Sequence, residues 1–145
     1  MNTMRILLIS LLAFGLTAAC SQSETQKQNA AELTLEEQVE QYISNANFEA
    51  AEQAVEEAAP ENAQELKEQI HLQHGIHLIY NADPSQMRES ANNALREFIK
   101  VLEINPENEK ARAEIDQILA IYRSFPDRQP EQEILDELEE MGFQV

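Results

Sequence analysis

The chain has 145 residues, with 27 acidic side chains against 10 basic ones and a formal net charge of −17. So acidic a balance argues against nucleic acid and anionic lipid headgroups as partners, and most of the charge is expected to form a solvated surface. A single cysteine excludes an internal disulfide. With three glycines and no run of alternating apolar residues long enough for a strand, the expected fold class is all-α.

Residues 1–19 have the layout of a secretory signal peptide. Arg5 is followed by an apolar run at 6–16 and by the small residues 17–19. The run is short for a transmembrane helix, which needs about 20 apolar residues. We therefore expect this segment to direct export and to be removed.

The cysteine stands directly after these small residues. The segment L-T-A-A-C at 16–20 resembles a bacterial lipobox, although Thr17 occupies the usual leucine position. The resemblance implies diacylglycerol on Cys20 and cleavage before it. Ser21 replaces the aspartate that would imply inner-membrane retention, so an outer-membrane anchor facing the periplasm is expected. Each buried lipid CH₂ contributes about 0.8 kcal/mol, so two or three acyl chains give a stable membrane anchor. The alternative is an ordinary secretory signal with an incidental cysteine.

The remaining chain divides into a tether and one domain. Residues 20–33 comprise the lipidated cysteine and a polar segment without apolar periodicity, which is typical of a flexible tether. Residues 34–145 form the predicted helical domain, which at about 110 residues can bury about 65% of its unfolded surface. Without residues 1–19 the chain keeps 9 basic and 27 acidic side chains, a net charge of −18.

Capping signals predict the first two helices. Thr34 and Glu37 form a T-x-x-E capping box, so a helix is expected from Leu35. A second helix is expected after Asn47, ending at Pro60.

Four further helices are predicted beyond that proline. The third covers about residues 61–81. Asp83 as N-cap and Pro84 at the first helical position start a fourth, which continues to residue 104. Asn105 and Pro106 start a fifth, with apolar residues at helical spacing as far as Phe125. A sixth covers 131–141 and is ended by the glycine at 142.

The stretch 91–106, A-N-N-A-L-R-E-F-I-K-V-L-E-I-N-P, has the clearest pattern. Ala94, Phe98 and Pro106 match the A-x3-F…P half of the tetratricopeptide (TPR) repeat. Gly75 takes the small-residue position of a first repeat helix. The chain therefore resembles a TPR-like protein. The resemblance implies about three antiparallel helical hairpins and a protein-binding scaffold, such as an accessory of an envelope assembly or secretion complex.

Catalytic motifs are lacking in the sequence. There is no G-x-S-x-G, no phosphate-binding glycine loop, and no cysteine free to act as a nucleophile once Cys20 is acylated. We expect no enzymatic activity and no cofactor.

Three histidines, His71, His74 and His77, lie three residues apart on the third predicted helix. One adjacent pair could share a metal, but H-x-x-H lacks the glutamate of H-E-x-x-H, and the sequence places no carboxylate beside them. Two interpretations stay open. The protein is a small metal-buffering or carrier lipoprotein, or these are weak metal candidates that line the surface or a groove.

The third predicted helix is apolar on nearly every side, so it needs cover on both sides unless neighbouring helices enclose it. Repeat spacing places six residues toward a concave groove: Leu72, Ile76, Ile79, Tyr80, Gln117 and Ile121. These positions lack the basic side chains of a carboxylate clamp. An apolar or basic-amphipathic segment of a protein partner is therefore expected there, with homodimerisation through the same patch as the competing outcome.

Overall fold

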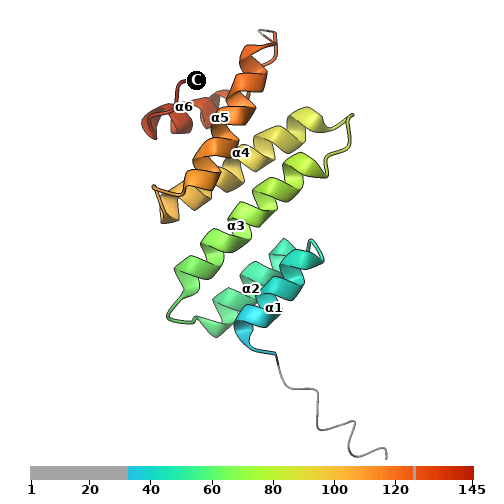
Figure 1. Ribbon diagram of the computed structural model, residues 1–145, viewed down its shortest axis with the longest axis vertical. Helices are drawn as coiled ribbons and strands as arrows, with labels where there is room; N and C mark the ends of the chain where they lie inside the picture. Colours follow the sequence, from blue (N-terminus) through green and yellow to red (C-terminus); the bar gives the residue numbers. More distant parts are fainter. Residues whose placement is uncertain (1–32, 126) are drawn as a thin grey trace, which may run out of the picture. The chain divides into compact units, whose positions relative to one another are not determined.

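The computed structural model describes residues 33–125 and 127–145, so the predicted signal peptide, Cys20 and tether residues 20–32 lie outside it. Within these ranges every regular element is a helix, which confirms the all-α fold class. Figure 1 shows their order. The helices are α1 (Leu35–Ser44), α2 (Phe48–Ala58), α3 (Ala63–Tyr80), α4 (Met87–Ile104), α5 (Glu109–Arg123) and α6 (Gln132–Glu140).

The first two helices begin where their caps predicted. At α1 the backbone N–H of Glu37 donates to Thr34 Oγ1 at 3.3 Å, and that of Thr34 donates to Glu37 Oε2 at 2.9 Å. The capping box is therefore complete. At α2 the side chain of Asn47 accepts from the N–H of Ala50. Both predicted starts are confirmed.

Helices α4 and α5 begin later than predicted, because polar side chains there form turns. Asp83 Oδ1 accepts from the N–H of Ser85 at 2.8 Å, so Asp83 closes a turn instead of capping a helix. Asn105 accepts from Glu107 in the same way. The N-cap of α5 is Asn108, which accepts from the N–H of residue 111 at 2.8 Å. Phe125, predicted on the helical face of α5, follows its end and is exposed.

Two clusters of buried side chains make up the core, and α3 packs against both. The first joins α1, α2 and the beginning of α3: Val39, Phe48, Ala51, Val55, Leu66 and Ile70. The second is built from α4, α5 and the α6 region, including Leu95, Phe98, Ile115, Leu119, Ile134 and Leu138. Half-buried residues of α3 pack against this second cluster, so apolar surface on α3 is covered from two directions. Figure 1 shows α3 between the α1–α2 pair and α4.

Packing of Phe98 between α3 and α4 depends on Gly75. A Cβ atom on this residue would lie 2.6 Å from Phe98 Cε1 and 2.8 Å from Cζ, which is closer than carbon atoms can pack. The Phe98 ring is fully buried and so cannot turn toward solvent. The ring of Phe98 thus packs on the bare helix backbone at Gly75.

We predict that Gly75→Ala destabilises the domain by about 1–2 kcal/mol, because overpacking costs more than the helix propensity gained. In a Phe98→Leu background the same substitution should be neutral or stabilising, since the aromatic edge is gone. Urea denaturation of the four proteins of this cycle measures the coupling. Equal effects of Gly75→Ala in both backgrounds would show that ring and glycine are not in contact.

Candidate functional site

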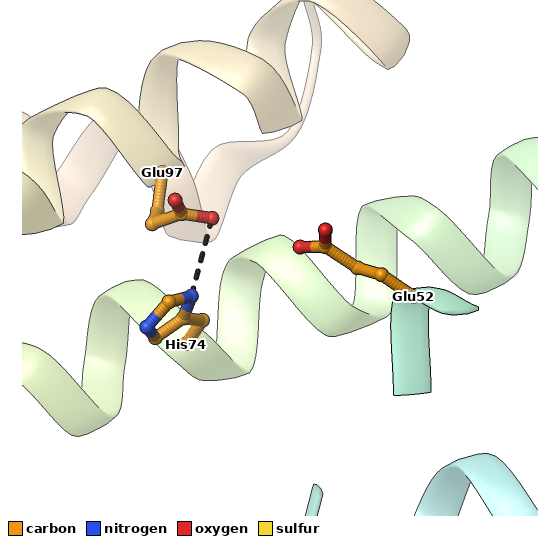
Figure 2. Close-up of side chains that lie close together, drawn as sticks. All are labelled: Glu52, His74 and Glu97. Carbon is orange, nitrogen blue, oxygen red and sulfur yellow. Dashed lines mark ion pairs between the residues drawn. The ribbon is translucent and has the colours of Figure 1, made fainter. Parts of the chain in front are cut away.

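Four ionisable side chains from α2, α3 and α4 meet in one cluster. They are Glu52 of α2, His71 and His74 of α3, and Glu97 of α4. Figure 2 shows three of them, with the carboxylates of Glu52 and Glu97 and the ring of His74 turned toward a shared space. We call this set the histidine–glutamate cluster.

Glu97 is the buried centre of the cluster, with only 7% of its surface exposed. It lies three residues after Ala94 and four before Val101, so it shares their apolar face of α4 and is carried inside with them. Its Oε1 accepts from Lys100 Nζ at 2.8 Å. Its Oε2 lies 2.8 Å from Nδ1 of His71. Both oxygens therefore have partners.

The ionisation of Glu97 follows from these contacts. Burial alone would raise the pKa of Glu97, but the contacts with His71, His74 and then Lys100 outweigh it and hold the pKa far below its ordinary value of 4.5. Glu97 is therefore a carboxylate at neutral pH. Because a carboxylate only accepts hydrogen bonds, Nδ1 of His71 carries the proton and donates.

His74 is held differently. Its ring stacks on Phe48 with centroids 4.4 Å apart and an interplanar angle of 12°. Its Nδ1 lies 3.4 Å from Glu97 Oε2, close enough for an ion pair. The two atoms are not aligned for a hydrogen bond, and this Nδ1 is buried without a hydrogen-bond partner among the described residues. Stacking thus fixes an imidazole nitrogen that faces a carboxylate without bonding to it.

Glu52 closes the cluster from α2. Its Oε1 lies 3.5 Å from Nδ1 of His71, and its side chain is 37% exposed. One ligand atom each from Glu52, His74 and Glu97 lies within 4.8 Å of the other two. The arrangement thus gathers one imidazole nitrogen and two carboxylate oxygens around a single point.

His77 lies apart from the cluster. Its ring makes a tilted contact with Phe48, with centroids 5.5 Å apart, and its Nδ1 lies 3.2 Å from the amide nitrogen of Asn81. The sequence allowed either adjacent histidine pair to share a site, and the structure brings together His71 and His74. The two glutamates were not predicted.

One of these glutamates had a signal in the sequence. A charged residue on the apolar face of a helix, as Glu97 is, must find partners when the helix packs. Glu114 of α5 follows the same rule: it lies three residues after Ala111, is 3% exposed, and pairs with Lys110. Glu52 carries no such signal.

The six predicted groove residues fall into two groups. Leu72, Ile76 and Ile79 are half-buried against the second core cluster. The others, Tyr80, Gln117 and Ile121, are exposed, with Tyr80 at 60% and Ile121 at 54%.

A polar contact joins the two helices that carry these residues. The Tyr80 hydroxyl of α3 lies 3.5 Å from Glu114 Oε2 of α5. Two open hollows among the described residues lie elsewhere, one around Tyr42 and Asn45 and the other around Arg88 and Asn92. The exposed groove residues line neither hollow, and we call the three of them together the α3–α5 face (Tyr80, Gln117 and Ile121).

Comparisons with known proteins give no family. No protein-family description, no curated protein and no solved structure matches this chain. The resemblances to TPR repeats and to a lipobox therefore stay predictions from the quoted residues. Among the helices that the structure describes, none is both long and apolar enough to span a membrane.

The ionisation of Glu97 predicts a pH effect on stability. Since its folded pKa lies below the unfolded value of 4.5, its contribution is complete above that pH and is lost as the pH falls below it. Lowering the pH from about 5.5 to about 3.5 should reduce the free energy of unfolding more steeply in wild type than in Glu97→Gln. Urea denaturation followed by circular dichroism at each pH measures both slopes, and parallel slopes would contradict the assignment. The charged groups facing Glu97 are common to both proteins: Glu52, His71, His74 and Lys100.

Proposed function

We propose that this protein is an outer-membrane lipoprotein facing the periplasm, whose TPR-like helical domain binds a basic-amphipathic segment of a partner protein on the α3–α5 face. The observation that carries the proposal is the exposure of Tyr80 and Ile121, large apolar side chains on two helices linked by the Tyr80–Glu114 contact. Exposed aromatic and branched side chains at such a position are typical anchors of a protein interface.

Two further observations support a repeat-like scaffold. Gly75 and Phe98, two residues that the resemblance to the repeat singled out, contact each other between α3 and α4. Consecutive helices from α1 to α5 also pack as neighbours, and α3 contacts both members of the preceding pair. A scaffold of this kind presents one helix from each hairpin to its ligand.

Charge favours a basic partner. The chain has a net charge of −17, and the α3–α5 face itself contains no basic side chain. Complementary charge speeds encounter and orients the ligand, while buried apolar contacts supply most of the affinity. A segment with lysines on one side and leucines on the other meets both conditions.

A synthetic amphipathic peptide of lysine and leucine provides a direct test. We expect Ile121→Asp to weaken its binding at least about tenfold, as for removal of an interface anchor. The added aspartate makes the domain more acidic, so attraction by charge alone would strengthen binding. Leu33→Asp, which changes an exposed leucine at the other end of the described chain, is the matched control and should bind as wild type. Fluorescence anisotropy measures all three affinities.

Two outcomes would overturn the α3–α5 proposal. Equal or tighter binding by Ile121→Asp would mean that the peptide responds only to the overall charge. Sedimentation that shows a wild-type dimer, and a monomer for Ile121→Asp, would assign the face to self-association instead.

The anchor has its own prediction. Cys20→Ser should abolish incorporation of labelled lipid and leave the protein unprocessed or soluble, because the acyl chains are the proposed attachment. Labelling with radioactive palmitate and fractionation of the envelope measure both effects. Normal cleavage together with membrane retention would contradict the lipobox interpretation.

A further inference from the structure

We infer that Glu52, His74 and Glu97 form a binding site for a divalent cation of the zinc class, with His71 and Lys100 orienting Glu97. Protein binding on the α3–α5 face neither requires nor explains this arrangement. The three ligand atoms come from three helices and converge within 4.8 Å. The sequence had raised metal binding only for the histidines of α3, and nothing in it placed a carboxylate from another helix beside them.

The separation of His74 and Glu97 is that of two ligands. Atoms bound at about 2.0–2.1 Å from a tetrahedral zinc ion are about 3.3–3.4 Å apart. Nδ1 of His74 lies 3.4 Å from Oε2 of Glu97. A hydrogen bond would be aligned and nearer to about 2.9 Å, and this contact is neither. Two such atoms can therefore bind one cation with little change in either side chain.

Glu52 supplies the adjustable third ligand. Its side chain is partly exposed and comes from a different helix, so a change of rotamer can move its carboxylate while the backbone stays in place. The exposure on this side of the cluster also gives a cation a route from solvent. Three protein ligands leave a fourth tetrahedral position for water, as in open zinc sites.

Outer partners already hold two ligands in place. Lys100 donates to Oε1 of Glu97 and His71 to Oε2, which keeps the carboxylate ionised and fixes its plane. Oε2 has a further lone pair for a cation. Phe48 stacks on His74 and fixes the direction of its Nδ1. Ligands supported by such hydrogen bonds and packing are the usual design of a metal site.

The ligand types indicate the metal. An imidazole nitrogen with two carboxylates suits Zn²⁺ and neighbouring transition ions, whereas Ca²⁺ and Mg²⁺ favour oxygen ligands alone. Two carboxylates and one ammonium give the cluster a net negative charge when its histidines are neutral. A dication is therefore electrostatically favoured at the point where the ligands meet.

Zinc titration of the full-length chain tests the inference. The chain carries Cys20→Ser to remove its only thiol, is stripped of metal with a chelator, and is titrated with Zn²⁺ against a chromophoric competitor. We expect one equivalent to bind and His74→Ala to weaken binding at least about tenfold, a loss that outer partners alone can cause. His77→Ala is the matched control, since it lies on the same helix and also contacts Phe48, and should leave affinity unchanged.

A second variant distinguishes the loss of a metal ligand from the loss of the folded structure. Glu97→Gln removes a buried charge and can destabilise the domain, whereas Glu52→Gln changes a partly exposed side chain. Glu52→Gln should weaken zinc binding at least about tenfold with an unchanged circular-dichroism spectrum. Binding of Co²⁺ should give the intense visible absorption of a tetrahedral ion, and the band should weaken in the same variant.

Three results would overturn the metal site. They are no binding at micromolar Zn²⁺, equal losses in His74→Ala and His77→Ala, and unchanged affinity in Glu52→Gln. Without any zinc binding, the cluster would be an ion-pair network only. Equal losses in the two histidine variants would mean that zinc binds to a surface group of histidines. Binding of the lysine–leucine peptide by His74→Ala separates this question from the α3–α5 proposal, because the two sites use different residues.

Discussion

The packing of Phe98 against Gly75 is the contact on which the rest of the domain depends. The missing side chain at Gly75 leaves the space that the Phe98 ring occupies between α3 and α4, because a Cβ atom there would overlap the ring. The same contact has a chemical consequence one residue away. Glu97 precedes Phe98, so the approach that buries the ring also carries a carboxylate to His71 and His74. The core contact and the candidate site therefore have one cause.

Burying Glu97 sets a condition that only a few side chains can meet. An ionised carboxylate loses strong interactions with water when it enters a protein, and the loss must be offset by hydrogen bonds and opposite charge. Lys100 and His71 supply both to Glu97, one at each oxygen. His74 also helps to lower the pKa of Glu97, but its Nδ1 lies 3.4 Å from Oε2 without an aligned hydrogen bond. This nitrogen without a hydrogen-bond partner is the observation from which the metal proposal starts.

Local signals in the sequence predicted the start of a helix correctly where the signal is compatible with only one local structure. The Thr34–Glu37 capping box starts α1 as expected, because its two hydrogen bonds require a helical turn. Asp83 and Asn105 are compatible with two local structures, because the same side chains can cap a helix or close a turn. In this protein both side chains close turns. Glu97 was predictable in principle from its place on an apolar face. Glu52 was not, because only the tertiary packing of α2 beside α3 brings it to the histidines.

The position of the cluster gives the metal inference a consequence for the whole domain. Glu52 belongs to α2, whose apolar face lies in the first core cluster, whereas Glu97 belongs to α4 and the second. His74 stands on α3, which packs against both. A cation held by these three side chains would join elements of both cores, and binding only to the folded chain would add stability that grows with free metal concentration. The α3–α5 face contributes no ligand to this site. A change in partner binding on adding metal would therefore have to pass through the packing of α3 itself.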